Sequence, residues 1–441
     1  MHLNIRRLLS IVAFIAFIAI APVIVLYAIG YRSVSTSLPE PVGVAIINAL
    51  PKKAVVSING TAYGTVPRSV PNLLPGTVEV QVAKDGYQPW QKKLEIKPMQ
   101  ATDARNIKLI PTTQDTDELT ADATAFATSP DASIIAIVNA KNEIFFMDQN
   151  GKFKTNSIAF KSPITEMVWS NDSSRVLIGT KQSGFTLLQF SNQAITKSAF
   201  VLPATDTRAK WDPADNQSIL ALTSKHELVR YNITTSTSAI IDSNCNTYTF
   251  SNNQLIYQRI DNTLVKGSFS QDLNQRALSI SASVNGDLAI LLESGELLIV
   301  DTRNTINSIS GHVLSSSWST DGSLLLLQSS PSELDIYNFS NERMRTLPIH
   351  ESHVLVRLAT TILNPSWFPD NAHIVYQTGS NLILSEVDPR DYVISTKIAD
   401  LPQQTQNNIW IAKDMNSLIH ITQAGNTTNL IRTWLVTKDD R

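Results

Sequence analysis

The chain has 441 residues, and its 36 basic and 38 acidic side chains give a net charge of −2. This length predicts two or three domains, and the balanced charge argues against a nucleic-acid-binding protein, which needs a basic surface for phosphate contacts. The single cysteine, Cys245, has no partner for an intrachain disulfide. We expect it to be a small buried apolar side chain, so stability must come from burial alone.

An uncharged segment of 24 residues extends from Leu8 to Tyr31. At about 1.5 Å per residue it forms about 36 Å of helix, enough to cross a hydrocarbon core of about 30 Å. We therefore predict one transmembrane helix over residues 8–31, bent at Pro22. A cleaved signal peptide is the alternative, because Ala28-Ile29-Gly30 is a suitable cleavage site. However, the apolar run exceeds the roughly 7–15 residues of a signal-peptide core.

Basic residues set the predicted orientation of this helix. Arg6 and Arg7 precede it and Arg32 follows it, so the positive-inside rule places residues 1–7 in the cytoplasm. The protein is expected to be a single-pass cell-membrane protein with an extracytoplasmic body, joined to the helix by a linker over residues 32–41.

Residues 42–111 alternate between short β-type runs and turns, which predicts a small β-sandwich. The Asn59-Gly60 pair favours a hairpin, because both turn positions need a positive φ. Residues 77–83 (TVEVQVA) alternate strictly, as in a strand with one buried face. The expected strands are 42–47, 54–58, 61–63, 77–83, 94–96 and 107–110, with Tyr87 and Trp90 as core anchors.

Several blocks of this module resemble the PEGA domain. They are Ala54–Gly60 after Pro51, Gly64-Thr65-Val66-Pro67, Leu74-Pro75-Gly76 and Lys84-Asp85-Gly86-Tyr87. The tetrapeptide that names the family is here Pro51-Lys52-Lys53-Ala54. The resemblance implies a bacterial envelope-associated protein in which the domain acts as a binding or spacer module.

Residues 112–124 (TTQDTDELTADAT) are polar and acidic, which predicts a second linker. Asp115, Asp117 and Asp122 suggest calcium binding, but the segment lacks the Gly and the terminal Glu of a calcium loop. A solvated linker is the favoured interpretation.

Residues 125–437 repeat a bulky residue, a polar turn and an apolar strand. The turn residues are Asp131, Asp172, Asp215, Asn252, Asn285, Asp321, Asp370 and Asp414. A spacing near forty residues, made of short strands, is typical of a β-propeller with four-stranded blades. We count eight blades, with seven as the alternative because the copies at 252 and 285 are short. The predicted fold class is all-β: a small PEGA-like sandwich, then a propeller, with one N-terminal transmembrane helix.

Two features of the repeat predict side-chain roles. Each turn Asp or Asn is expected to bond the backbone of its own turn. Tryptophans precede four turns and are expected to pack between blades rather than form a sugar-stacking surface; they are Trp169, Trp211, Trp318 and Trp367. The architecture resembles WD-repeat-like and periplasmic Tol-system propellers.

The sequence contains no nucleophile elbow, P-loop or Gly-x-Gly-x-x-Gly motif. His350 and His353 form the closest histidine pair and are expected in a surface loop rather than at a zinc ion. We expect no catalytic, cofactor-binding or metal-binding residues and no cofactor. The predicted function is non-enzymatic binding of an envelope protein or glycan, with no nucleic-acid partner. An envelope hydrolase or lyase with a propeller-borne site, or a scaffold subunit of a membrane complex, are the alternatives.

Overall fold

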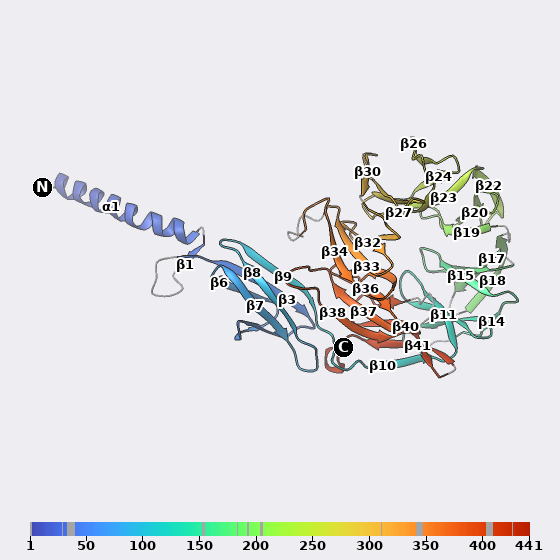
Figure 1. Ribbon diagram of the computed structural model, residues 1–441, viewed down its shortest axis with the longest axis horizontal. Helices are drawn as coiled ribbons and strands as arrows, with labels where there is room; N and C mark the ends of the chain where they lie inside the picture. Colours follow the sequence, from blue (N-terminus) through green and yellow to red (C-terminus); the bar gives the residue numbers. More distant parts are fainter. Residues whose placement is uncertain are drawn as a thin grey trace. The chain divides into compact units, whose positions relative to one another are not determined.

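The computed structural model describes residues 2–28, 30–32, 40–151, 155–182, 184–191, 194–202, 206–309, 311–340, 347–402, 409–425 and 427–441 (Figure 1). The chain forms two compact units. The first contains Met1–Thr113, Asp388–Ile394 and Val436–Arg441, and the second contains Gln114–Val387 and Ser395–Leu435. The first unit is therefore built from three separate stretches of sequence.

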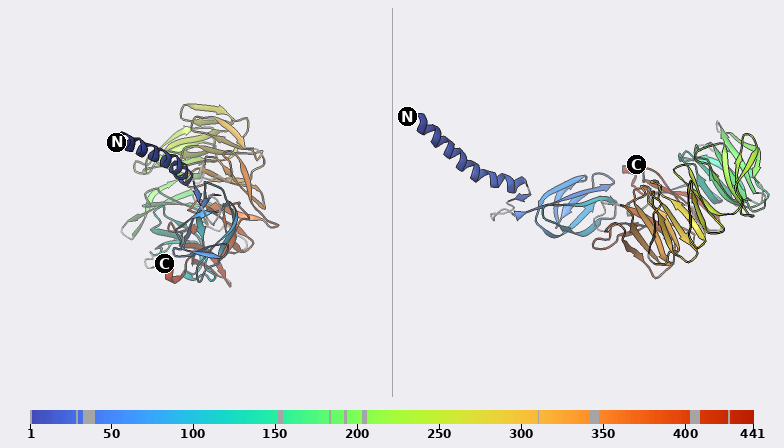
Figure 2. Two further views of the ribbon diagram at one scale, coloured as in Figure 1. Left: turned by 90° about the vertical axis from the view of Figure 1, so that its left-hand side faces the viewer. Right: turned by 90° about the horizontal axis from the view of Figure 1, so that it is seen from above.

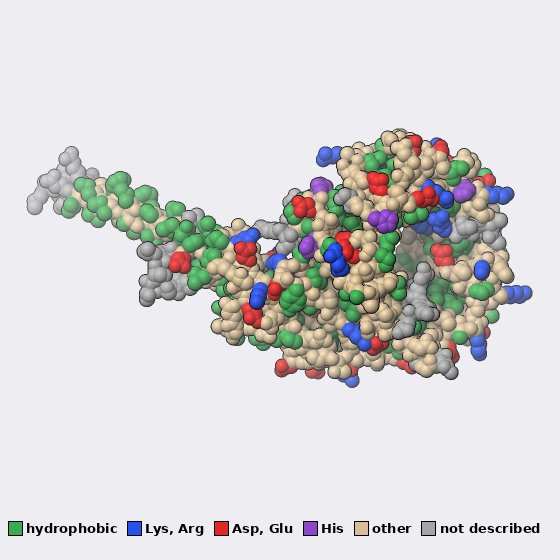
Figure 3. Space-filling view, in the orientation of Figure 1, with side chains coloured by type: hydrophobic (Ala, Val, Ile, Leu, Met, Phe, Trp, Pro, Cys, Tyr) green, Lys and Arg blue, Asp and Glu red, His purple; other side chains and the backbone are tan. Residues whose placement is uncertain are grey.

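Helix α1 (His2–Ala28) begins the first unit and continues through Pro22. Its segment Leu8–Ala28 is long and apolar enough to cross a membrane and is not buried, and Figure 3 shows hydrophobic side chains along most of the helix. The predicted end at Tyr31 was wrong. Gly30 has a φ of 99°, and this left-handed conformation ends a helix at little cost only for glycine.

The predicted linker over residues 32–41 contains a short strand pair. β1 (Tyr31–Arg32) pairs with β2 (Glu40–Pro41), and residues 33–39 lie outside the described residues. The Arg32 guanidinium lies 3.6 Å from the centre of the Tyr27 ring. The chain is thus hydrogen-bonded to itself directly after the helix.

Two sheets form a sandwich in the first unit, and Figure 2 shows its two layers. The strand orders are β6-β3-β9 and β5-β4-β7-β8. The strands are β3 (Gly43–Leu50), β4 (Val55–Ile58), β5 (Thr61–Thr65), β6 (Arg68–Leu73), β7 (Gly76–Ala83), β8 (Trp90–Ile96) and β9 (Ala101–Lys108). Burial alternates along β7, as the sequence pattern predicted for residues 77–83, and also along β3 and β8, and Tyr87 and Trp90 belong to the core, as expected.

Strand β6 was not predicted, because Pro71 interrupts its pattern. A proline cannot donate a backbone hydrogen bond and is tolerated mainly at sheet edges. β6 is such an edge strand, since it pairs with β3 alone among the described strands.

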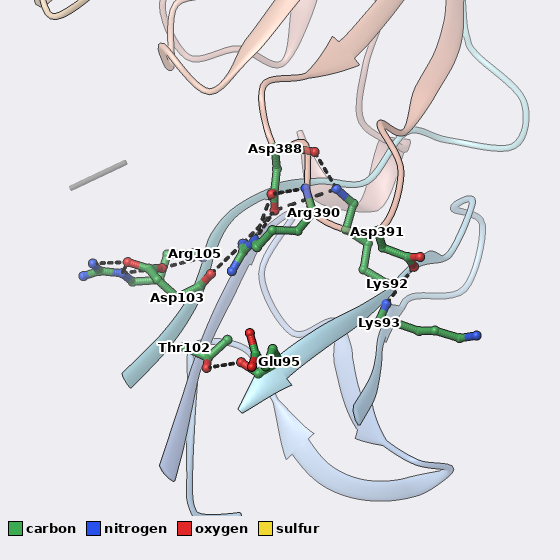
Figure 4. Close-up of polar contacts among 9 residues, drawn as sticks. All are labelled: Lys92, Lys93, Glu95, Thr102, Asp103, Arg105, Asp388, Arg390 and Asp391. Atoms are coloured by element: carbon green, nitrogen blue, oxygen red, sulfur yellow. Dashed lines mark hydrogen bonds and ion pairs between the residues drawn. The ribbon is translucent and has the colours of Figure 1, made fainter. Parts of the chain in front are cut away.

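The sandwich contains a buried lysine, Lys92, whose polar partners come from the segment Asp388–Ile394. Lys92 lies on the inward-facing side of β8 and is 1% exposed. Its Nζ donates to the Asp388 carbonyl oxygen at 2.7 Å and lies 3.8 Å from the Asp388 carboxylate. Arg390 donates to the Asp103 carbonyl oxygen at 2.7 Å, and the Asp391 carboxylate accepts from the Lys93 amide at 2.9 Å (Figure 4). The segment therefore supplies the polar partners that the charge of Lys92 needs when buried.

The segment Val436–Arg441, which includes the 3₁₀ helix η1 (Lys438–Asp440), completes the first unit. The Tyr87 hydroxyl donates to the Asp440 carboxylate at 2.8 Å and accepts from the Thr437 amide at 2.8 Å. Burial alone would raise the pKa of Asp440, but hydrogen bonds from Lys84, Tyr87 and Thr437 hold it below its ordinary value. The ring of Tyr87 thus packs in the sandwich core while its hydroxyl bonds the segment Val436–Arg441.

Eight four-stranded antiparallel sheets make up the second unit among the described residues. We number them sheets 1 to 8. Sheet 1 contains β11 (Ala123–Thr128), β12 (Ile134–Asn139), β13 (Glu143–Asp148) and β14 (Ile158–Ala159); sheet 2 contains β15 (Ile164–Trp169), β16 (Arg175–Thr180), β17 (Gly184–Ser191) and β18 (Ala194–Leu202); sheet 3 contains β19 (Asp206–Trp211), β20 (Ser218–Thr223), β21 (Leu228–Asn232) and β22 (Thr237–Asp242). Sheet 4 contains β23 (Cys245–Ser251), β24 (Gln254–Arg259), β25 (Thr263–Lys266) and β26 (Phe269–Asp272); sheet 5 contains β27 (Ala277–Ala282), β28 (Leu288–Leu292), β29 (Leu297–Val300) and β30 (Ile306–Ile309); sheet 6 contains β31 (Ser315–Trp318), β32 (Leu324–Ser330), β33 (Glu333–Asn338) and β34 (Ser352–Arg357). Sheet 7 contains β35 (Ile362–Trp367), β36 (His373–Thr378), β37 (Asn381–Glu386) and β38 (Ser395–Asp400), and sheet 8 contains β39 (Trp410–Ile411), β40 (Ser417–Ala424), β41 (Thr427–Trp434) and β10 (Thr116–Thr120).

Successive sheets pack face to face around the propeller, as Figure 2 shows. The apolar clusters between them combine residues of neighbouring sheets, for example Phe146 of sheet 1 with Trp169 of sheet 2. The second strands β12, β20 and β28 are buried along almost their whole length. A strand buried on both faces needs a neighbouring sheet on each side, and the eight sheets match the eight copies counted in the sequence.

Strand β10 joins sheet 8 although it precedes sheet 1 in the chain. It pairs antiparallel with β41, with Glu118 opposite Ile431. The prediction of a solvated linker over residues 112–124 was therefore wrong at this strand. β10 is the outermost strand of sheet 8 and is mostly exposed. Its backbone pairs with β41, and Leu119 alone among its side chains packs against the apolar cluster shared by sheets 1 and 8, so a mostly polar sequence can form it.

The tryptophans of the repeat connect neighbouring sheets, as predicted. The indole Nε1 of Trp169 donates to the Ala127 carbonyl oxygen at 3.1 Å, and that of Trp211 donates to Val168 at 3.0 Å. Trp367 donates to Ser317 at 3.0 Å. Each bond runs from the end of one first strand to the first strand of the preceding sheet.

We predict that Trp367→Phe lowers the free energy of unfolding more than Trp318→Phe. Both side chains are partly buried at the end of a first strand, but Trp318 Nε1 has no hydrogen-bond partner within the described chain. The difference should be about 1 kcal/mol, the net contribution of one hydrogen bond. Urea denaturation followed by circular dichroism measures it, and equal losses would contradict the role assigned to the Trp367 bond.

Candidate functional site

The turns between first and second strands are built by aspartates. The carboxylates of Asp131, Asp172 and Asp321 each accept from the backbone amide two residues later at 3.0 Å. Asp215, Asp370 and Asp414 accept in the same way at 2.9, 2.9 and 3.0 Å. The predicted self-capping of the turns is confirmed at these positions.

Two copies of the repeat depart from this pattern. Asn252 occupies a left-handed turn position with a φ of 48°. Asn285 donates instead to the Asp321 carbonyl oxygen in the next turn of the ring, at 3.0 Å. Both belong to the short copies of the repeat. Asn252 shapes its own turn and Asn285 connects two turns, whereas Asp131 bonds the backbone of its own turn.

A cavity of about 390 Å³ lies where sheets 1 and 8 meet, and we call it the closure cavity. Turns of both sheets and the end of β41 line it. Its lining residues are Asp131, Ala132, Gln149, Asn150, Trp410, Ala412, Lys413, Asp414, Ser417, Arg432 and Trp434. The volume falls within the roughly 300–1,000 Å³ that small-molecule sites occupy.

Arg432 is the buried charge of the closure cavity and is 9% exposed. One of its terminal nitrogens donates to the Gln149 carbonyl oxygen, whereas its Nε has no hydrogen-bond partner within the described residues. Burial lowers the pKa of Arg432, opposed by Asp117, Asp414 and Asp148. A buried guanidinium N–H without a partner is costly and is a candidate donor to a ligand.

Two tryptophans outside the repeat also line the closure cavity. Trp410 is partly buried and packs against the apolar cluster shared by sheets 1 and 8. Trp434 donates from Nε1 to the Asp117 carboxylate at 2.6 Å, and Arg432 lies 5.4 Å from the centre of its ring. Asp117 of the closing strand β10, one of the three aspartates that suggested calcium binding, thus fixes the position of the Trp434 ring.

A second group of charged side chains lies on the first strands of sheets 2 and 3. These strands lie nearer the middle of the propeller than the fourth strands β18 and β22 (Figure 1). Glu166 is on β15, and Arg208 and Lys210 are on β19. All three side chains are exposed to solvent, but the surrounding protein partly desolvates them. Desolvation raises the pKa of Glu166, opposed by Lys210, and it lowers the pKa of Lys210, to which Arg208 adds. One acid and two bases therefore interact electrostatically at the inner side of the ring.

The cysteine and the histidine pair considered from the sequence lie apart from any cluster of metal-binding side chains among the described residues. Cys245 is fully buried, as predicted, and burial raises the pKa of its thiol to about 12. His350 lies in a turn, with its Nδ1 3.3 Å from the Tyr337 hydroxyl, and His353 is on β34. Within the described residues, no three His, Cys, Asp or Glu side chains cluster as metal ligands would.

Sequence reasoning missed the closure cavity. Trp410 precedes Asp414 by four residues, as Trp211 precedes Asp215, whereas Trp434 precedes no turn of the repeat. The additional tryptophan after the last turn, Trp434, was the available signal. The pairing of β10 with β41, which brings Asp117 to Trp434, joins residues too distant in sequence for a local pattern to reveal.

The sandwich can now be compared with known families. Residues 42–112 match the PEGA domain. The PEGA domain thus covers all seven strands of the sandwich, and the resemblance inferred from the turn blocks is confirmed. No curated protein matches the chain.

Two solved structures are similar to this chain in fold. The β-propeller domain of Myceliophteria thermophila Cps50 (Swd1) is 13% identical, with a TM-score of 0.45 over 73% of this chain and 100% of that one. The C-terminal WD40 domain of Sif2 is 13% identical, with a TM-score of 0.49 over 72% of this chain and 98% of that one.

We predict that acid destabilises the propeller through its turn aspartates. Burial alone would raise the pKa of Asp131, but hydrogen bonds from Ser129, Ser133 and Ser173 lower it from 3.8 to about 2. A pKa lower in the folded state means that folding favours the carboxylate. Its stabilisation is present above pH 3.8 and is lost as the pH falls through about 2.

The test is urea denaturation of wild type and Asp131→Asn between pH 6 and pH 2. Asparagine keeps an acceptor oxygen but does not titrate, so the variant should lose less stability than wild type between about pH 4 and pH 2. Parallel pH profiles of the two proteins would contradict the assignment.

Proposed function

We propose that this is a non-enzymatic, membrane-anchored cell-envelope protein that binds a protein or glycan. The helix anchors it with residues 1–7 in the cytoplasm, and the PEGA domain and the propeller lie outside the membrane. The observation that carries the proposal is the exposed, uncharged helical segment Leu8–Ala28, joined in one chain to two binding-type modules.

The length and the flanks of the helix support anchoring. Its 21 residues, none of them charged, span about 31 Å at about 1.5 Å per residue, the thickness of a hydrocarbon core. Arg6 and Arg7 precede the segment, which favours a cytoplasmic N-terminus. Tyr27 and Arg32 contact each other at the other end, where aromatic and basic side chains suit the lipid headgroups.

The propeller supports a binding role. Its tryptophans, turn aspartates and buried amides mostly serve packing and hydrogen bonding between sheets, as at Trp211 and Asn246. Among the described residues, the closure cavity offers a ligand both aromatic and polar walls. This combination is typical of recognition sites.

The anchor is tested by expressing the full chain, with a C-terminal epitope tag, in bacterial cells. We expect the chain to stay in membranes washed with alkaline carbonate, and protease added to spheroplasts to remove the tag while a cytoplasmic marker survives. Ile18→Lys should release the chain, since a lysine at mid-membrane costs about 2.5–3.5 kcal/mol, and Ile18→Leu should not.

Two results would contradict this topology. One is a tag that resists protease until the membrane is opened. The other is a soluble chain that begins after residue 28, which would identify the helix as a cleaved signal peptide.

An envelope hydrolase or lyase is the second candidate, and the charged group on β15 and β19 favours it. Partial desolvation by the surrounding protein raises the pKa of the exposed Glu166 carboxyl, the direction that suits a proton donor. If the site is catalytic, Glu166→Gln should reduce cleavage of an envelope polysaccharide by about 100-fold or more, measured by chromatography of the products. Equal cleavage by variant and wild type, or none by either, would leave Glu166 without a catalytic role.

A further inference from the structure

We propose that the closure cavity binds a neutral saccharide. This inference rests on the proposed binding function and names its site and ligand class. The cavity lies within one unit of the structure and at one junction of the ring, where sheets 1 and 8 meet. Its volume of about 390 Å³ is within the range of small-molecule sites and suits a short oligosaccharide.

The aromatic walls favour a ring-shaped ligand with an apolar face. Trp410 and Trp434 line the cavity and are both partly buried. One face of a pyranose ring carries mainly C–H groups, which pack against the π face of an indole. Trp434 is held in place by its bond to Asp117, so this ring is ordered before a ligand arrives and little side-chain entropy is lost on binding.

The polar walls match hydroxyl groups, which both donate and accept. The Arg432 Nε is a buried donor without a partner among the described residues. Asn150 is exposed at the cavity and offers an amide that can donate and accept. The Asp414 carboxylate, after accepting from Asn416 at 3.0 Å, still has oxygen lone pairs for a hydroxyl donor.

The balance of charge argues for a neutral ligand. Lys413 and Arg432 line the cavity together with Asp131 and Asp414, so the charges of the lining cancel. Asp117 and Asp148 also act on Arg432. An anionic ligand would meet these carboxylates and a cationic ligand would meet the guanidinium, whereas hydroxyl groups can bond to both.

The test titrates the detergent-solubilised full chain with trisaccharides while tryptophan fluorescence and binding heat are recorded. The neutral probes are trimers of glucose, galactose, mannose and N-acetylglucosamine; the charged probes are trimers of galacturonate and glucosamine. At least one neutral trimer should bind with a Kd below about 1 mM. Trp410→Ala should weaken it about tenfold or more and Asn150→Ala about threefold, as loss of a stacking or hydrogen-bonding group does.

Trp318→Phe, in sheet 6, is the control and should bind as wild type does. Trp410 also packs against the core between sheets 1 and 8, so Asn150→Ala decides the matter if Trp410→Ala lowers the Tm. The proposal is overturned if no neutral trimer binds, if a charged trimer binds more tightly, or if Asn150→Ala binds as wild type. In each case the membrane-anchored binding role is judged separately, by the topology experiment and by capture of a protein partner.

Discussion

The second unit depends on one constraint, which is that its sheets are apolar on both faces. β20 is buried at every position, and no single sheet can cover both of its own faces. Each sheet therefore needs two neighbours, and the series is complete only if the last sheet packs against the first. The structure meets this requirement with β10, which pairs with β41, and with an apolar cluster shared by sheets 1 and 8. Backbone pairing at this one junction thus supports burial around the whole ring.

The same junction produces the closure cavity. At three other junctions a repeat tryptophan, such as Trp211, donates to the first strand of the preceding sheet, but the two tryptophans of sheet 8 have other positions. Trp410 and Trp434 line a space instead, and Arg432, which is buried, lines it with them and donates to the Gln149 carbonyl oxygen after β13. Two tryptophans that line a cavity, in place of one that bonds the preceding first strand, therefore distinguish this junction from those three.

Much of the fold could be predicted because local sequence patterns determine its turns and strands. Asn59-Gly60 marks a hairpin, alternation along residues 77–83 marks a strand with one buried face, and the Asp turns mark the sheets of the propeller. What could not be predicted depends on pairing over long distances. The acidic residues 116–120 are a strand only because β41 is present, and the partner of the buried Lys92 is Asp388, almost three hundred residues away. The charged group of Glu166 and Lys210 also arises from neighbouring sheets, and spacing alone does not place it.

The most direct test of the account is the register of the closing strand. Glu118 and Ile431 are opposite each other, so the double variant Glu118→Cys with Ile431→Cys should form a disulfide on mild oxidation, identified by mass spectrometry of the joined peptides. The native Cys245 is fully buried and should remain a thiol. The pair Glu118→Cys with Thr427→Cys, out of register on the same two strands, should stay reduced. A failure of the first pair to join, or equal joining of both pairs, would contradict closure of the ring by β10.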